Sequence, residues 1–137
     1  MNVLLDTNIL IDYLTDREPF CEYSNEIFEM IKNFKISGMI AAHSVTNLWY
    51  ILRKDYNRQQ RKQMFMMLFD FFEISAVDKD KLFAAVLNDK FEDFEDCVQV
   101  ECAFDCGADY IITRNIQDFV YSKIPPVTPE EFVKLVV

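Results

Sequence analysis

Some acidic and amide side chains stand directly after short apolar runs, and such side chains are the usual ligands of hard divalent cations. The clearest case is Asp6, which ends the apolar run 2–5 and is followed at once by Thr7 and Asn8. A buried carboxylate costs several kcal/mol unless it has a partner. No Lys or Arg adjoins Asp6 in the sequence. A divalent cation such as Mg²⁺ would supply that partner.

Further polar residues follow the other predicted strands. Asn47 lies one turn into the helix after the second strand, and Asp93 and Asp96 stand three residues apart at the start of a later helix. Ligands of an open parallel sheet bind at the carboxyl ends of its strands, so we expect these side chains to converge there. Acids at a helix start also have a simpler explanation, because they complement the helix dipole. The fourth predicted strand is followed by Thr113, Arg114, Asn115 and Asp118.

The elements that must position these residues alternate between strands and helices. Apolar runs predict strands at 2–5, 39–42, 73–77 and 108–113. Periodic apolar residues predict helices at 7–14 and at 20–34, the latter with Gly38 just past its end. Capping residues predict four helix starts: Ser44 for a helix to 52, Asn57 for a helix at 58–72, Asp78 for the next helix, and Thr128 with Pro129 for the last. A further helix is predicted to end at Cys106 and Gly107. This alternation predicts an α/β fold, a single domain over residues 1–137 with helices on both faces of a central parallel sheet.

Composition excludes several classes of site. The chain has 137 residues and a net charge of −9, which argues against a globally basic nucleic-acid binder. Its two glycines, Gly38 and Gly107, exclude glycine-rich phosphate loops and the G-x-S-x-G nucleophile elbow. The single histidine, His43, excludes metal sites that need two, and we interpret it as structural.

Cysteine spacing and hydropathy indicate a reducing, non-membrane environment. The four cysteines form no C-x-x-C motif and are expected to be buried free thiols. No apolar run approaches the ~20 residues of a membrane span. The segment MNVLLD is unlike a signal peptide. We therefore expect a cytoplasmic protein without membrane contact.

Motifs along nearly the whole chain, from Val3 to Phe132, resemble a PIN domain. They are VLLDTNILIDYL, a helix near SVTNLWYILRK, FEDFEDCVQVECAFDCGADYIITRN, and QDF after it. The resemblance implies a three-layer PIN-like α/β fold and a nuclease that cuts RNA with acidic residues around Mg²⁺ or Mn²⁺. Many PIN domains are toxins of bacterial toxin–antitoxin pairs, so an antitoxin partner and a homodimer are also expected.

The resemblance also assigns roles to individual residues. Asp6 matches the first acid of the family and Asp96 the third. Asn47 stands where many members carry Glu, and Asn115 where others carry Asp. Asp93 is our candidate for the missing charge, so the expected metal ligands are Asp6, Asp93 and Asp96, with catalytic help from Asn115. Supporting roles are expected for Thr7, Asn8, Asn47, Thr113 and Asp118.

The segment RKDYNRQQRK, residues 53–62, carries five positive charges and one negative, or +4, which leaves −13 on the rest of the chain. A solvated helical face is the usual meaning of such a run. In a nuclease the same charges would contact phosphates that flank the cut. The candidate RNA-binding residues are Arg53, Arg58, Arg61 and Lys62.

Two rival interpretations remain. The neutral Asn47 and Asn115 are compatible with a degenerate PIN module that binds RNA or protein without cutting. A phosphatase or receiver-like domain would use Asp6 as a nucleophile. Such phosphatases usually carry D-x-D, and here the third residue is Asn8.

Overall fold

A five-stranded, all-parallel sheet forms the centre of the computed structural model, which describes all of residues 1–137. Its strand order is β3-β2-β1-β4-β5. Neighbouring strands pair in parallel throughout, as the alternation of elements predicts. The strands are β1 (Asn2–Leu5), β2 (Ser37–Ala41), β3 (Phe72–Ser75), β4 (Tyr110–Ile112) and β5 (Pro126–Val127).

Seven α-helices surround this sheet, and most begin where the sequence predicts. Capping boxes at Asn57 and Thr128 and a side-chain cap at Asp78 start three of them, because each side-chain oxygen accepts a hydrogen bond from a backbone N–H of the first turn. The helices are α1 (Thr7–Leu14), α2 (Cys21–Lys32), α3 (Ala42–Ile51), α4 (Arg58–Phe71), α5 (Lys79–Leu87), α6 (Phe94–Asp105) and α7 (Pro129–Val136), with short 3₁₀ helices at Leu52–Lys54 and Ile116–Phe119.

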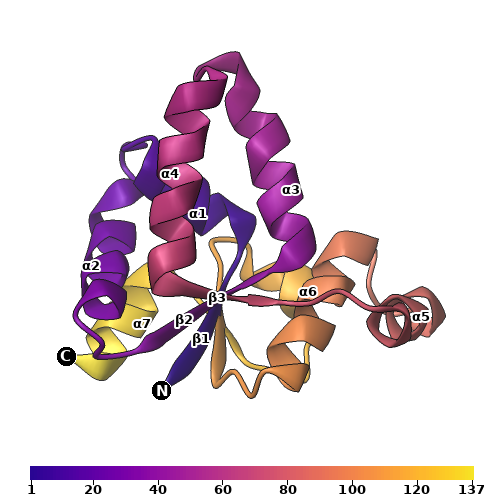
Figure 1. Ribbon diagram of the computed structural model, residues 1–137. Coiled ribbons are helices and arrows are strands. Elements are labelled where there is room, and N and C mark those ends of the chain that lie inside the picture. Colours follow the sequence, from indigo (N-terminus) through magenta and orange to yellow (C-terminus); the bar gives the residue numbers. More distant parts are fainter.

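The sheet separates two hydrophobic cores, which makes the fold three-layered. Side chains alternate along each strand, so Val3 and Leu5 face one core and Leu4 faces the other. The larger core packs α1, α2, α3, α4 and α7 on one face, and the smaller packs α5 and α6 on the other. Figure 1 shows α2 and α7 on one side of the strands and α5 and α6 on the opposite side. The α/β fold with a flanked central sheet is therefore confirmed.

Two expectations about local structure are wrong, and one strand was not predicted. Ser44 is not an N-cap: α3 begins at Ala42, and the Ser44 side chain is buried inside the first turn. Gly38 does not terminate a helix but lies in β2 opposite Phe72, where an added Cβ would come within 2.6 Å of the Phe72 ring. Strand β5 was not expected, since a two-residue strand has no periodicity.

Strand β5 nevertheless has a clear physical basis. It lies at the sheet edge, and its neighbours donate to it: Ile111 N–H donates to the Pro125 carbonyl and Thr113 N–H to the Val127 carbonyl. Proline lacks an N–H but keeps its carbonyl acceptor, so an edge strand tolerates it. This pairing fixes the end of β4, from which Thr113 leads toward the carboxyl edge of the sheet.

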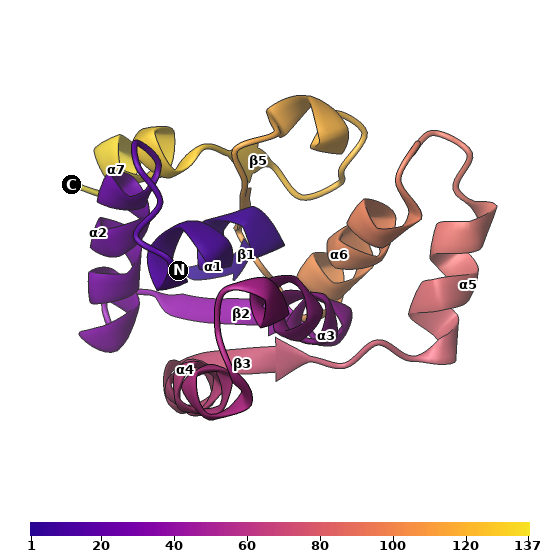
Figure 2. The same cartoon turned by 90° about the horizontal axis from the view of Figure 1, so that it is seen from above.

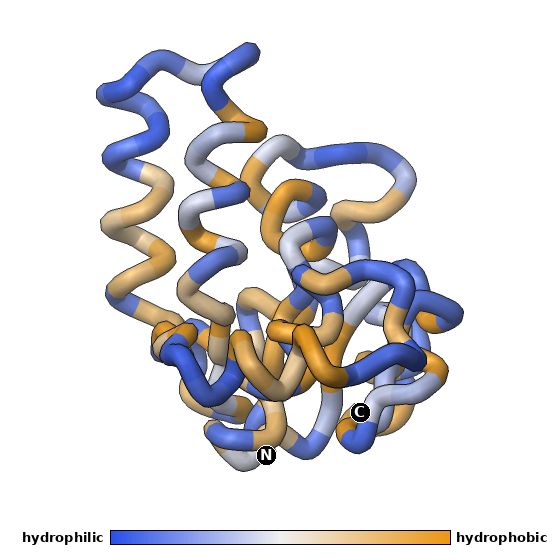
Figure 3. Tube along the Cα trace, turned by 90° about the vertical axis from the view of Figure 1, so that its right-hand side faces the viewer, coloured by the Kyte–Doolittle hydropathy of each residue, from blue (hydrophilic) through white to orange (hydrophobic).

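Helices α3 and α4 form a hairpin that rises away from the sheet, as Figure 1 shows, and both helices are seen nearly end-on in Figure 2. The tip of this hairpin is hydrophilic, as the blue upper turn of Figure 3 shows. It contains the basic segment 53–62. The base of α3, by contrast, starts directly at the carboxyl end of β2 and brings His43 and Asn47 to the sheet edge. No helix of the chain combines the length and the apolar character that crossing a membrane requires.

Candidate active site

A cavity of about 250 Å³ lies at the carboxyl edge of the sheet and collects most of the predicted site residues. We call it the acidic cavity. Five carboxylates line it, contributed by the end of β1, the start of α6 and the 3₁₀ helix after β4, and no Lys or Arg does. Its lining residues are Asp6, Thr7, Asn8, His43, Ser44, Asn47, Ile51, Asp93, Glu95, Asp96, Gln99, Asn115 and Asp118.

Asp6 is buried and held by three hydrogen-bond donors. Its Oδ1 accepts from the Thr7 backbone N–H at 2.8 Å and from Gln99 Nε2 at 3.0 Å, and its Oδ2 accepts from Thr113 Oγ1 at 2.8 Å. These bonds supply the partners that burial of a carboxylate requires, without any cation. They also hold the carboxylate in one orientation at the floor of the cavity.

Gln99 is the residue of this group that sequence reasoning missed. It lies on α6, 93 residues from Asp6, and is only 3% exposed. The one sequence signal that points to Gln99 is a polar side chain among the apolar residues of a predicted helix, because a buried amide needs a hydrogen-bond partner. Thr113, which was predicted, bonds to Asp6 and also accepts the Asn115 N–H at 3.0 Å, which links the end of β4 to the same carboxylate.

The start of α6 brings three acids to the cavity. Asp93 is the N-cap of this helix, and its Oδ1 accepts the Asp96 backbone N–H at 3.1 Å. Burial, together with the charges of Asp93, Asp6, Asp118 and Glu95, raises the pKa of Asp96 to about 7 from an ordinary value of 3.8. The cavity therefore holds its negative charge at an electrostatic cost.

Asn47 faces the same acids from the opposite wall. Its side-chain amide donates to Glu95 Oε2 at 3.1 Å, and His43 Nε2 lies 3.0 Å from the Glu95 backbone carbonyl. Glu95 was not among the predicted site residues. Its carboxylate lies within hydrogen-bond distance of the Asn47 side chain.

Asn8, Asn115 and Asp118 complete the cavity wall. The Asp118 N–H donates to the Asn115 carbonyl at 3.0 Å and so starts the 3₁₀ helix. Arg114, between Thr113 and Asn115, points elsewhere: its Nε pairs with Asp12 Oδ2 at 2.8 Å, and Asp12 is fully buried. Burial raises the pKa of Asp12, although the Arg114 charge opposes this shift. Neither residue of the pair lines the acidic cavity.

Buried polar atoms without partners also mark this region. Ser44 Oγ, Gln99 Oε1 and His43 Nδ1 have no hydrogen-bond partner, and all three residues line the acidic cavity. Buried polar atoms are usually paired, so unpaired ones grouped at a cavity are typical of a ligand or solvent site. No three His, Cys, Asp or Glu side chains lie close enough together to form a ready-made metal cluster.

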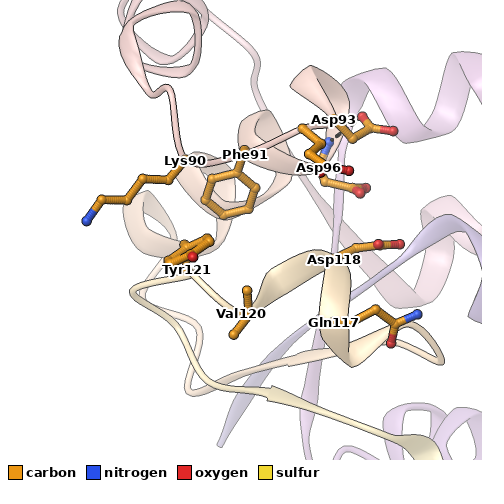
Figure 4. Close-up of a pocket in the computed structure, with 9 residues that line it drawn as sticks. Lys90, Phe91, Asp93, Asp96, Gln117, Asp118, Val120 and Tyr121 are labelled. Atoms are coloured by element: carbon orange, nitrogen blue, oxygen red, sulfur yellow. Dashed lines mark hydrogen bonds between the residues drawn. The ribbon is translucent and has the colours of Figure 1, made fainter.

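A second, larger cavity of about 510 Å³ adjoins the first and shares Asp93, Asp96 and Asp118 with it. Figure 4 shows these three acids at one end and the aromatic rings of Phe91 and Tyr121 toward the other. We call it the aromatic cavity. The remaining residues that line it are Lys90, Glu92, Gln117 and Val120.

The basic residues of the hairpin lie outside both cavities. Arg53 stacks 3.6 Å from the Tyr50 ring centroid, and Arg61 lies 4.4 Å from that of Trp49. Arg61 also donates to the Trp49 carbonyl at 3.1 Å, which fixes its guanidinium on the hairpin. Arg58 and Lys62 are exposed and make no ion pair.

Comparison with known proteins agrees with this fold. The family model described as "PIN domain" matches residues 2–117. Among solved structures, the chain is similar to VapBC2 from Rickettsia felis bound to a DNA fragment from its promoter (19% identity, TM-score 0.70, covering 93% of this chain and 98% of that chain). It is also similar to a toxin–antitoxin complex from Klebsiella pneumoniae (25% identity, TM-score 0.70, covering 93% and 97%).

A third similar structure is the sarcin–ricin loop cleaving toxin VapC20 from Mycobacterium tuberculosis. It shares 13% identity with a TM-score of 0.64, and the match covers 80% of this chain and 86% of that one. No curated protein matches the chain. At identities of 13% and 19%, likeness to a solved structure speaks for the fold alone.

Proposed function

Because the chain belongs to the PIN domain family, we propose that it is a metal-dependent endoribonuclease whose active site is the acidic cavity. The observation that carries this proposal is the convergence of five carboxylates, free of any Lys or Arg, at the carboxyl edge of the sheet. Parallel α/β folds bind their ligands at this edge. Carboxylates gathered without basic partners are typical of a site for a hard cation.

The donor set suits Mg²⁺ or Mn²⁺, because it consists of carboxylate and amide oxygens. The raised pKa of Asp96 supports this, since it reflects burial first and then repulsion from the neighbouring acids, and a bound cation would offset both by favouring the charged carboxylate. We assign metal binding to Asp6, Asp93 and Asp96, and we add Glu95 as a fourth acid. When bound, the metal would lower the pKa of water and stabilise negative charge on a phosphodiester.

The protein's own groups orient this site. Gln99, Thr113 and the Thr7 N–H hold Asp6 in place, so its carboxylate needs no reorganisation when substrate arrives. Asn47 holds Glu95 through its side-chain amide. Asn8, Asn115 and Asp118 line the same cavity.

Affinity for the RNA backbone is assigned to Arg53, Arg58, Arg61 and Lys62 on the α3–α4 hairpin. Their charges are the main basic cluster in a chain of net charge −9. Lysine and arginine release counterions when they contact phosphates, and this favours binding. A path from the hairpin to the acidic cavity runs along α3, because Ile51 near its end lines that cavity.

RNA cleavage in the presence of Mn²⁺ tests this function. We expect cutting with Mn²⁺ or Mg²⁺, none in chelator, and loss of cutting in Asp6→Asn. That variant should fold, since the asparagine keeps one oxygen for the Thr7 N–H and Gln99 Nε2 donors, and its new amide would face the Thr113 hydroxyl, which can accept a hydrogen bond. Asp109→Asn, an exposed acid far from the cavity, is the matched control. Equal cutting by wild type and Asp6→Asn would overturn the assignment.

We propose in addition that the protein is the toxin of a toxin–antitoxin pair and acts as a homodimer in the cytoplasm. The similarity to the Klebsiella pneumoniae toxin–antitoxin complex supports the pair. Expression in bacteria should arrest growth, and coexpression of a small protein encoded beside it should relieve the arrest. Light scattering tests the dimer. Growth that is unaffected by wild type at full expression would contradict the toxin assignment.

A second candidate function is an RNA- or protein-binding module that does not cut. The neutral side chains of Asn47 and Asn115 in the cavity wall favour it. The same assay separates the two functions, because a binding module retains RNA affinity without cutting in either metal.

A further inference from the structure

The aromatic cavity has the composition of a nucleotide-binding site. Tyr121 is 61% exposed, and its ring and that of Phe91 line the cavity together. Lys90 Nζ lies 5.8 Å from the Tyr121 ring centroid, and Lys90 makes no ion pair. It is the only Lys or Arg that lines either cavity.

The aromatic cavity lies next to the acids of the acidic cavity. It shares Asp93, Asp96 and Asp118 with the acidic cavity, so the two form neighbouring compartments with a common wall. Figure 4 shows that the acids lie at one end and the rings toward the other. A chain with its phosphodiester at the acids would therefore carry the adjoining nucleotide into the aromatic cavity.

We propose that the aromatic cavity binds the nucleotide next to the cut, with its base stacked on Tyr121 and Phe91 and its outer phosphate held by Lys90. This inference rests on the proposed function and names its substrate class. Bases stack on aromatic side chains only when they are unpaired, so the substrate is single-stranded or looped RNA. Because every base has a π-face, the site selects unpaired structure and not base identity.

The apolar side chains that line the aromatic cavity favour binding of a base over binding of a free anion. Val120 is 67% exposed beside Tyr121, while Phe91 packs partly against the smaller core. Exposed apolar side chains of this kind are typical of binding surfaces. Glu92 and the shared acids would repel an inorganic anion that lacked a base to stack.

The test is fluorescence anisotropy with a labelled single-stranded 12-nucleotide RNA in Ca²⁺, which needs no cleavage as a readout. Tyr121→Ala should weaken binding at least about fivefold, from the ~1–3 kcal/mol of one base stack. Tyr121→Phe should restore affinity, because it keeps the ring. Phe83→Ala is the matched control, since Phe83 is also 61% exposed and lines neither cavity.

Two further arms separate the parts of the inference. The same strand annealed to its complement should bind more weakly than the single strand and lose the Tyr121 dependence. Lys90→Gln should flatten the salt dependence of binding, by about 0.7 in the log–log slope for one single-strand phosphate contact, whereas Lys79→Gln should not. Thermal melting verifies that each variant is folded.

The outcomes distinguish this inference from the proposed nuclease. If Asp6→Asn cuts as well as wild type but Tyr121→Ala binds RNA poorly, the nuclease assignment fails and the nucleotide site stands. If wild type cuts and Tyr121→Ala binds RNA like Phe83→Ala, the nucleotide site is overturned. Tight duplex binding with no preference for the single strand would overturn it as well.

Discussion

Asn47 and Glu95, 48 residues apart in the chain, are joined by a 3.1 Å hydrogen bond from the Asn47 amide to Glu95 Oε2. The bond spans the acidic cavity between α3 and the start of α6. It places a carboxylate beside the position where many PIN domains carry Glu on α3. Glu95 therefore brings a carboxylate to the Asn47 side chain from the facing helix.

The first prediction follows from this pair. Glu95→Gln should weaken Mn²⁺ binding by roughly tenfold, because hard cations gain from each carboxylate. Isothermal titration measures this directly, with Glu92→Gln as the control, since Glu92 stands in the same segment but does not line the acidic cavity. Asn47→Glu combined with Glu95→Gln should recover affinity. An equal loss in the two glutamine variants would show that Glu95 only accepts the Asn47 hydrogen bond.

Gln99 is the subject of the second prediction. Gln99→Leu keeps a side chain of similar size on α6 but removes one of the three hydrogen-bond donors to the buried Asp6 carboxylate. A buried acceptor that loses a partner costs ~1–3 kcal/mol. Urea unfolding should show that loss for Gln99→Leu and almost none for Gln117→Leu, at an exposed site. In Gln99→Leu/Asp6→Leu, the loss from the Gln99 substitution should be much smaller.

Local signals predicted much of the fold, whereas the site depended on contacts between distant residues. The caps at Asn57, Asp78 and Thr128 are encoded within three residues of sequence, and they appear where expected. Ser44 matched the same pattern but failed as a cap, because the chain enters α3 directly from β2 and buries it.

The hydrogen bonds that assemble the site have no such local signal. Gln99 reaches Asp6 across 93 residues, and Thr113 reaches it across 107. The order of strands around β1 brings them together, and no periodicity in the sequence reports which amide will meet which carboxylate. Asp6 itself was predictable, because an acid that ends an apolar strand is unusual.

A third prediction concerns pH. The pKa of Asp96 is raised to about 7, so between 3.8 and about 7 the folded state binds a proton that the unfolded state releases. This contribution to stability is complete below pH 3.8 and is lost as pH rises through about 7. Relative to Asp96→Asn, the wild type should therefore lose stability by at most about 1.4 kcal/mol per pH unit across that window.

Urea unfolding in chelator, from about pH 5 to about pH 8, measures this difference. Asp80→Asn, an exposed acid on α5, controls for general charge effects. Parallel profiles for wild type and Asp96→Asn would show that Asp96 titrates normally in the folded protein.

The fourth prediction addresses metal binding as stabilisation. A ligand that binds only the folded state stabilises it by about 2.7 kcal/mol at a concentration of 100 Kd. Mn²⁺ should raise the melting temperature of the wild type by several degrees, and by much less in Asp6→Asn/Asp96→Asn. Asp70→Asn/Asp80→Asn carries the same charge change at two exposed positions that make no ion pair. Equal Mn²⁺ shifts in both double variants would remove the acidic cavity as the metal site.

The last prediction tests the hairpin as the backbone-binding surface. Arg58 and Lys62 are exposed and make no ion pair. Arg58 lies 5.9 Å from the Trp49 ring centroid, whereas Arg61 lies 4.4 Å from it and also bonds to the Trp49 carbonyl. Arg58→Gln/Lys62→Gln should therefore weaken RNA binding with little loss of stability. It should also reduce the log–log salt slope by about 0.7 per lost single-strand contact. Lys35→Gln/Lys79→Gln removes two charges outside the hairpin and should leave the slope unchanged. A salt slope that is equal in both double variants would mean that the hairpin charges are a solvated face, and that RNA is held by the cavities at the sheet edge alone.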